Sequence, residues 1–228
     1  GEVWVASGDY KRQHDPTCDP FEVVRCDTFI TEATFGLPVY RWPDTSEVAR
    51  DIVAWRDRCA ERGEAAILYC YALGKAQRVL AELAVHTDEP VLLHGAVANG
   101  VDVYRRARVP MIDTLPVSDT DKAADFAGKL VLAPPSAAGS SWIRRFRRAQ
   151  QGFASGWMQI RGNRRRRNYD RGFVVSDHAD WPDLMRTVRE TGASRVIATH
   201  GNTDAIIRAL NEDGIAAEAF RTDFGGEE

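Results

Sequence analysis

Five polar residues of this sequence follow short apolar runs, and their side chains are those of acid–base and metal chemistry. Asp9 comes after "VWVASG", and Glu32 comes after "TFIT". His178 and Asp180 come after "GFVV", and His200 comes directly after "RVIAT". Because open α/β sheets bind ligands at the carboxyl ends of their strands, these residues are candidates for one site.

Carboxylate and imidazole groups without thiolate are typical ligands of zinc or manganese in hydrolytic sites. A metal-dependent phosphodiesterase uses its ions to make hydroxide and to absorb charge, and an acid to protonate the leaving oxygen. In this scheme Asp9 bridges two ions roughly 3.5–4 Å apart, and His200 ligates one of them. His178 suits the acid if Glu32 holds its second nitrogen, because a carboxylate partner raises the pKa of an imidazole. Asp180 is grouped with this pair as a catalytic candidate.

Each of these residues also has a simpler interpretation. Asp9 can close a Gly-Asp turn, and Asp180 can cap a helix that begins near Trp181. His200 can be an incidental residue in a strand-to-helix turn. Two ions also need more ligands than Asp9 and His200 supply, since the remaining histidines show no HxH or HxxxH spacing. Either the metal interpretation is wrong, or most of the ligands lie outside this sequence.

The positive charge of the chain is concentrated in one segment. The whole sequence has a formal net charge of −3, but residues 141–171 contain ten arginines and one acid. A basic patch on an acidic body is typical of polyanion binding, and the alternative is a disordered charged loop. Lys75 is added because it begins a predicted helix, whose N-terminus favours phosphate. The predicted nucleic-acid contacts are Arg144, Arg145, Arg164, Arg165, Arg166, Arg167 and Lys75.

The bulk composition indicates an ordinary globular protein, with 44% hydrophobic and 28% charged residues in 228. The longest apolar run, residues 65–73, is too short to cross a bilayer, so no membrane partner is expected. The four cysteines show no CxxC spacing, which indicates neither a zinc knuckle nor a disulfide framework. These features favour a reduced, cytoplasmic protein.

Short β-rich runs alternate with helical patterns, so the sequence predicts an α/β fold. The predicted strands are 3–6, 23–24, 28–31, 66–70, 91–93, 129–133, 172–175, 195–199 and 216–220. The predicted helices are 44–63, 75–85, 101–107, 181–191 and 203–213. Asp44 and Glu47 have capping-box spacing, and Gly192 and Gly214 stand where helices end. The Pro-rich segment 36–46 introduces a separate βα series, which indicates an inserted α/β domain.

Five segments, in order, resemble one family of nucleases: "SGDYKRQ", "ITEATFG", "ALGKAQR", "SDHADW" and "THGNT". They are similar to the second part of metallo-β-lactamase-fold nucleases of the β-CASP group, whose members act on RNA or DNA. The segments "GWMQIRGNRRRRNYDRGFVVSDHADW" and "YALGKAQRVLAEL" look like a bacterial branch of that group. This branch is called ligase-associated DNA exonuclease, and sometimes mRNA 3′-end processing factor. The resemblance extends over essentially all 228 residues.

The resemblance implies a partial αββα sandwich of the metallo-β-lactamase type. Residues 1–36 and 172–228 are expected to form this core, and residues 37–171 the inserted β-CASP domain that caps it. Half of the sandwich is expected to be missing, because the family's upstream HxHxDH motif is not in this sequence. We therefore expect an amino-terminally truncated fragment that binds metal poorly and is inactive by itself.

The same resemblance implies a role for each matching residue. Asp9 corresponds to the aspartate that bridges two Zn²⁺ ions, with Mn²⁺ as an alternative metal, and His200 to the last zinc ligand. Glu32 corresponds to the acidic residue of β-CASP motif A. His178 corresponds to the histidine of motif B and is expected to be the general acid.

The resemblance thus implies a metal-dependent nuclease acting on DNA ends, associated with an ATP-dependent DNA ligase and helicase system. An RNA 3′-end processing ribonuclease of the same fold is the nearest alternative, because arginine–phosphate contacts do not distinguish the two sugars. A non-catalytic nucleic-acid-binding module is a second alternative. A nucleotide-binding α/β protein is disfavoured, since no GxGxxG or P-loop motif follows any strand.

Overall fold

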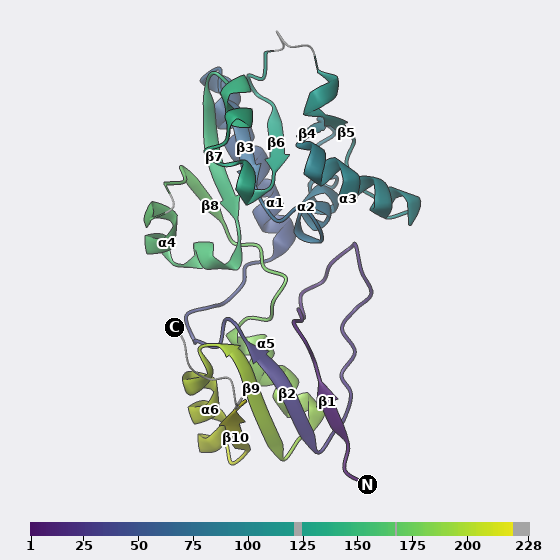
Figure 1. The fold of residues 1–228 in the computed structure, drawn as a ribbon, viewed down its shortest axis with the longest axis vertical. Helices are drawn as coiled ribbons and strands as arrows, with labels where there is room; N and C mark the ends of the chain where they lie inside the picture. The colour runs from purple at the N-terminus through teal and green to yellow at the C-terminus, as the bar shows by residue number, and fades with distance from the viewer. Residues whose placement is uncertain (121–124, 167, 221–228) are drawn as a thin grey trace. The chain divides into compact units, whose positions relative to one another are not determined.

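The computed structural model describes residues 1–120, 125–166 and 168–220. These residues form two compact units (Figure 1). Of the described residues, the first unit contains Gly1–Gln13, Pro20–Arg41 and those from 177 to 220, and the second contains His14–Asp19 and those from 42 to 176. The predicted domain boundaries, 36/37 and 171/172, each lie five residues before the observed change of unit at 41/42 and 176/177.

The first unit is built on a four-stranded parallel sheet with the order β1-β2-β9-β10. Its strands are Trp4–Ala6, Thr28–Ala33, Arg195–Gly201 and Ala216–Ala219. Phe29 and Val196 are paired in register and point to the same face of the sheet. They share a core with Leu184 of α5 and Ile206 of α6, so both helices cover that face. These helices are Trp181–Thr191 and Thr203–Glu212.

On the opposite face of this sheet, aromatic and charged side chains of different strands lie near one another. Trp4 of β1 is 51% exposed. The guanidinium of Arg195 lies 5.6 Å from the centre of its ring. Arg195 also donates to Glu218 on the neighbouring strand β10. Trp4 is therefore a large aromatic side chain that stands exposed on this face of the sheet.

The second unit contains a six-stranded parallel sheet with the order β5-β4-β6-β3-β7-β8. In chain order its strands are Ala65–Tyr69 (β3), Val91–Leu93 (β4), Thr114–Pro116 (β5), Leu130–Ala133 (β6), Ala149–Ala154 (β7) and Arg171–Phe173 (β8). Its helices are Thr45–Glu61 (α1), Lys75–Leu83 (α2), Gly95–Arg106 (α3) and Arg161–Arg166 (α4). Helices and strands alternate from α1 to β5, as in an α/β fold, and β5, β6 and β7 then follow one another with no α-helix among the described residues between them.

Strand β3 lies inside this sheet and is buried along its whole length. Ala66 and Leu68 pack with α1, α2 and α3 on one face. Ile67 and Tyr69 pack on the other face with residues such as Phe126 and Phe146. Because both faces of a parallel sheet are covered, its central strand is continuously apolar rather than alternating.

Several sequence predictions are confirmed and others are wrong. The strand 91–93 and the helix 181–191 have the predicted bounds, and Asp44 caps α1 by accepting from the amides of Ser46 and Glu47. Residues 23–24 form no strand, and β5, β7 and α4 were not predicted. The strand predicted from Gly172 pairs with β7, so it belongs to the second unit rather than to the sheet of the first.

Among the described helices, none combines the length and apolar character that a membrane crossing requires.

Candidate active site

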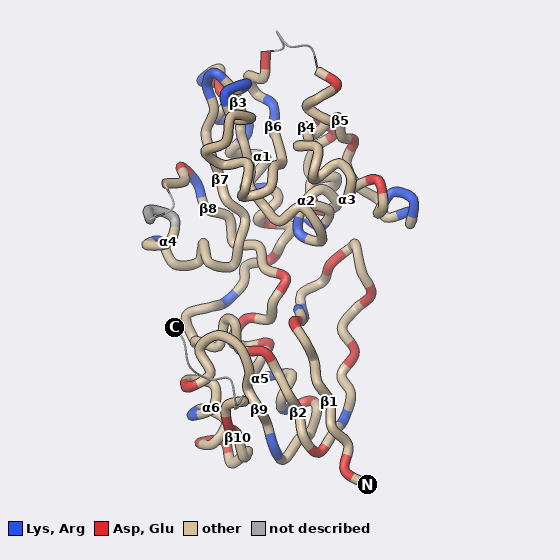
Figure 2. The backbone as a smooth tube through the Cα atoms, in the orientation of Figure 1, with Lys and Arg blue, Asp and Glu red and all other residues tan. Residues whose placement is uncertain are grey.

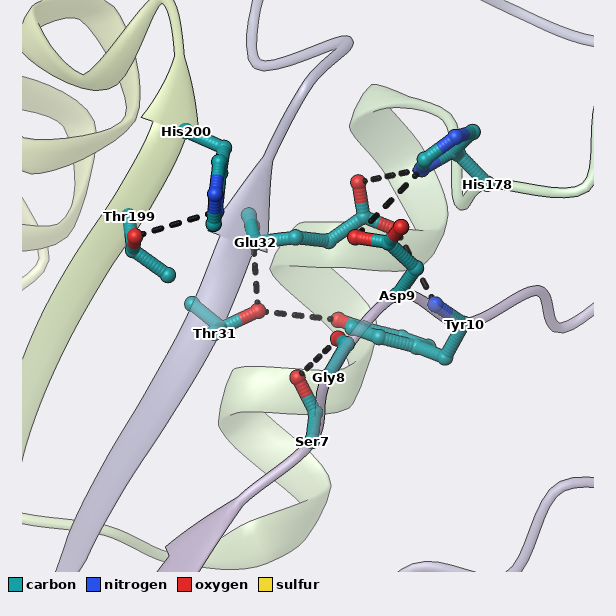
Figure 3. Close-up of polar contacts among 9 residues, drawn as sticks. All are labelled: Ser7, Gly8, Asp9, Tyr10, Thr31, Glu32, His178, Thr199 and His200. Atoms are coloured by element: carbon teal, nitrogen blue, oxygen red, sulfur yellow. Dashed lines mark hydrogen bonds and ion pairs between the residues drawn. The ribbon is translucent and has the colours of Figure 1, made fainter.

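The centre of the candidate site is Glu32, a buried carboxylate near the end of β2. Its side chain is 1% exposed. One oxygen, Oε1, accepts a hydrogen bond of 3.1 Å from the backbone N–H of Tyr10. The other, Oε2, lies 2.8 Å from Nδ1 of His178 (Figure 3). Because a buried carboxylate is costly without hydrogen bonds, these two contacts stabilise Glu32 in its place.

His178 lies in the segment between β8 and α5, and its side chain is 29% exposed. Nδ1 faces Glu32 and also lies 3.9 Å from Oδ1 of Asp9. The imidazole packs edge-on against Phe35, with 5.8 Å between the ring centres. One nitrogen of the ring is thus held by the protein, which orients the other for chemistry. The contact between Glu32 and His178 that the sequence predicted is present.

Asp9 stands three residues after β1, and its side chain is 66% exposed. One ligand atom from each of Asp9, Glu32 and His178 lies within 4.8 Å of the others. Asp9 therefore presents a solvent-accessible carboxylate beside a buried one. The two acids differ in environment, and so can differ in role.

Tyr10 is a site residue that the sequence reasoning missed. It is buried, its hydroxyl lies 3.4 Å from Oγ1 of Thr31, and its ring stacks on Phe21. Burial raises the pKa of Tyr10 to about 12, so the phenol stays neutral. Its functional atom is the backbone N–H that binds Glu32. In the sequence, only its position next to Asp9 could have indicated that Tyr10 belongs to the site. The type of a side chain does not indicate that the backbone N–H of the residue has a role.

His200 is the second-to-last residue of β9 and is exposed. Its φ is +58°, an uncommon left-handed conformation for a residue with a side chain. Oγ1 of Thr199 lies 3.1 Å from Nδ1 of His200. Glu32 pairs in register with Thr199, so His200 is close in the sheet, but Figure 3 shows the Glu32 side chain extending toward His178. His200 is not in the group of three that the structure brings within ligating distance.

Asp180 is the N-cap of α5. Its Oδ1 accepts a 3.0 Å hydrogen bond from the backbone N–H of Asp183, and its residue is 7% exposed. The structure shows the capping role that was the simpler interpretation, and Asp180 does not join the group of Asp9, Glu32 and His178. Burial, with the charge of Asp180 nearby, raises the pKa of Asp183.

Lys75 was predicted to contact phosphate at the start of α2, but it is 3% exposed. Its Nζ lies 5.2 Å from the centre of the Tyr71 ring. A lysine this deeply buried does not offer its ammonium at the surface as the prediction requires. The sequence correctly placed Lys75 at the helix start, after Gly74 with φ of +78°, and did not predict its burial.

The predicted arginine contacts fall into two groups. Arg144 is exposed, whereas Arg145 donates to Oγ1 of Thr120 at 3.3 Å and lies 5.9 Å from the centre of the Phe126 ring. Arg167 lies outside the described residues, and so do the side chains of Arg164, Arg165 and Arg166. Figure 2 shows that the described basic residues of the second unit occupy several separate places along the backbone.

The donor chemistry of the group fits one divalent cation. Two carboxylates and an imidazole within 4.8 Å are ligands that Mn²⁺ and Zn²⁺ accept. They do not fit two ions, because a two-metal site needs more donors than three, and no other such group occurs among the residues that the structure describes. Asp9 is the best candidate ligand, since Nδ1 of His178 is already bonded to Glu32.

Comparisons with known proteins show similarity to a curated protein and to solved structures. No model of a known protein family matches the chain. A protein of Opitutus terrae named "Probable DNA ligase" is 30% identical over 217 residues, which are 95% of this chain and 21% of the relative. The chain therefore spans about a fifth of the length of that curated relative.

One of the solved structures with a similar fold is the crystal structure of a protein of unknown function from Enterococcus faecalis V583. It matches with a TM-score of 0.58, at 10% identity, over 99% of this chain and 57% of that chain. At this identity the likeness shows a shared fold alone.

Proposed function

We propose that this chain is part of a metal-dependent nuclease that cleaves phosphodiester bonds at DNA ends, of the ligase-associated β-CASP type. The observation that carries the proposal is the buried Glu32 carboxylate, 2.8 Å from His178 and beside the exposed Asp9. In this proposal the first unit belongs to the metallo-β-lactamase core, and the second is the β-CASP domain.

His178 is the proton-transfer group of the proposed reaction. Glu32 binds Nδ1, which leaves Nε2 to face the substrate and donate a proton to the leaving oxygen. The buried carboxylate fixes the ring tautomer and stabilises the imidazolium form, as the orienting acid does in a catalytic triad. The Tyr10 amide keeps Glu32 aimed at the ring.

Asp9 would hold the divalent metal, with Zn²⁺ or Mn²⁺ as the ion. The resemblance makes His200 a further ligand, although His200 is not in the group formed by Asp9, Glu32 and His178. When bound, such an ion supplies hydroxide at neutral pH and neutralises charge on the phosphodiester. The exposed carboxylate of Asp9 and the exposed imidazole of His200 suit this role, because both are open to solvent. Glu32 is buried and bonded at both oxygens, which suits an orienting residue better than a ligand.

The relative named "Probable DNA ligase" supports DNA as the substrate. A nuclease that trims DNA strands and a ligase that joins them both act on strand ends. A nuclease segment that works together with a ligase would therefore share its substrate. We infer that the partners are DNA backbone and a DNA ligase, with RNA as the substrate to be tested against DNA.

The four consecutive arginines at 164–167 are proposed to bind backbone phosphates. Their replacement by glutamine should reduce the magnitude of the slope of log Kd against log salt by about 3–4 for duplex DNA, at roughly 0.9 per lost contact. Arg144→Gln is the comparison, since it removes one exposed arginine from a different segment.

The deciding experiment is a nuclease assay of the intact gene product on end-labelled DNA and RNA of matched sequence, with Zn²⁺ or Mn²⁺. We expect cleavage of DNA, and a loss of about 100-fold or more in His178→Ala with unchanged DNA affinity. His86→Ala is the control, because this histidine bonds Ser46 in the other unit at 2.8 Å. Retained cleavage in His178→Ala would overturn the proposal, and faster cleavage of RNA would change its substrate.

A further inference from the structure

Arg78 is the largest fully buried side chain of the second unit, at 0% exposure. It lies on α2, whose neighbouring residues Val79 and Leu80 belong to the main core of that unit. A guanidinium carries five N–H donors and a permanent charge, so complete burial is costly unless several acceptors surround it. The residues that surround Arg78 therefore indicate its purpose.

The acceptors come from three separate segments of the same unit. Nη1 donates to the backbone carbonyl of Ser176 at 2.8 Å. Nη2 donates to the carbonyl of His14 at 3.1 Å and to Oγ1 of Thr45 at 2.6 Å. Nε lies 3.8 Å from Oδ2 of Asp15, which balances the charge.

Two of these acceptors are main-chain carbonyls on the segments that carry the candidate site. Ser176 is two residues before His178, and His14 is five residues after Asp9. The chain passes from one unit to the other at 13/14 and at 176/177, next to both carbonyls. One guanidinium thus holds the two points from which the Asp9 and His178 segments extend.

We propose that Arg78 is a positioning residue for the Asp9–Glu32–His178 group. By binding the His14 and Ser176 carbonyls together, it fixes where the two segments begin, and with them the contact between His178 and Glu32. Its effect on cleavage rests on the proposed function, whereas its effect on the geometry of His178 does not.

The geometry requires arginine in particular. A planar fork can donate in fixed directions to two carbonyls and a hydroxyl at once, whereas lysine is a single point charge on a flexible stem. Arg78→Lys keeps the charge opposite Asp15 and loses the fork. The variant therefore separates positioning from charge balance.

The test is NMR of the 228-residue chain with ¹⁵N-labelled histidine at alkaline pH. The parent protein should show His178 as one tautomer, with hydrogen on Nδ1 bonded to Glu32. Arg78→Lys should show mixed tautomers while the amide signals of β2 and β9 stay in place. Arg105→Lys is the matched control, because it loses a 3.2 Å bond to the Ile112 carbonyl in the same unit and should leave His178 unchanged.

A folded Arg78→Lys with an unchanged His178 tautomer overturns the proposal. If that variant does not fold, Arg78→Gln, which can still donate to one carbonyl, is measured in the same way. Failure of both to fold, with Arg105→Lys folded, assigns Arg78 to stability alone and also overturns it. In the intact nuclease, Arg78→Lys should lower kcat about 10-fold with KM unchanged. If Arg78→Lys changes the His178 tautomer but the intact protein has no nuclease activity, the positioning role of Arg78 is supported and the proposed function is wrong.

Discussion

Nδ1 of His178 lies 2.8 Å from Oε2 of Glu32, and the other Glu32 oxygen accepts from the Tyr10 amide at 3.1 Å. Both oxygens of a carboxylate that is 1% exposed are therefore occupied by donors. Replacing His178 would leave Oε2 of Glu32 buried without a hydrogen bond. The free-energy cost of such an unsatisfied oxygen exceeds the net stabilisation that one hydrogen bond gives. Glu32 and His178 thus behave as one unit, to which Asp9 adds an exposed negative charge.

Glu32→Gln should reduce cleavage by the intact protein about 100-fold, with little change in KM. The amide keeps the size of the side chain but cannot stabilise an imidazolium at Nδ1. Steady-state kinetics on a labelled DNA end measure the effect. Glu64→Gln serves as the control, since Glu64 pairs with Arg62 at 2.9 Å in the other unit. Activity of Glu32→Gln within threefold of the parent would contradict the assigned role.

His200→Gly should leave the melting temperature unchanged or raise it. A left-handed φ of +58° costs a residue with a side chain about 1 kcal/mol, and glycine avoids this cost. The same change should abolish cleavage if His200 is a metal ligand. Calorimetry and the nuclease assay on the same samples give both results. A clear fall in the melting temperature would indicate that His200 contributes to folding rather than to function.

Gly201→Ala should destabilise the protein by about 2–4 kcal/mol. Gly201 has φ of +75°, and a Cβ there would overlap the carbonyl oxygen of Ala33 and approach Cα of Thr34 to 2.6 Å. Gly214→Ala is matched to it, since φ is +82° but nothing lies within 4 Å of the added carbon. Urea unfolding of both variants should show a much smaller loss for Gly214→Ala. Equal losses would show that backbone conformation alone sets the cost.

His94→Asn should weaken the fall in stability on acidification below about pH 6.5. Burial lowers the pKa of His94 from 6.5, so the folded protein favours the neutral ring. The unfolded chain then binds more protons between the folded pKa and 6.5, and stability is lost as the pH falls through that window. Nδ1 caps α3 by accepting from the Ala96 amide at 3.1 Å, a bond that asparagine can replace. Melting temperatures from pH 5 to pH 8 compare the two proteins, and parallel profiles would contradict the prediction.

Local sequence patterns predicted the elements whose cause is local. The helix Trp181–Thr191 has an N-cap Asp180, a proline in its first turn and Gly192 in the left-handed conformation at its end. Strand β7, with the sequence AQQGFA, was missed because its first half is polar. Its Gln151 accepts a 3.0 Å hydrogen bond from the Tyr69 hydroxyl, a partner 82 residues away that no local pattern shows.

The candidate site could be predicted in residue type but not in detail. Aspartate before a helix serves equally as a cap or as a catalytic acid, and the structure shows the cap for Asp180. The burial of Lys75 and the main-chain role of Tyr10 arise from packing between segments far apart in the chain. The pairing of Glu32 with His178 was suggested by the chemistry of a carboxylate and an imidazole rather than by spacing, since 146 residues separate them.

The order of strands in the first unit has a consequence for the synthesis of the chain. Thr28 of β2 pairs with Arg195 of β9, so 167 residues must be made before the partner strand exists. Until then β2 lacks its neighbour β9, and Phe29 lacks its cross-strand partner Val196. The six-stranded sheet uses strands from Ala65 to Phe173 only and can close earlier on the ribosome. The strand that carries Glu32 therefore completes its pairing late, and Glu32 meets His178 only after residues 42–176 have been synthesised.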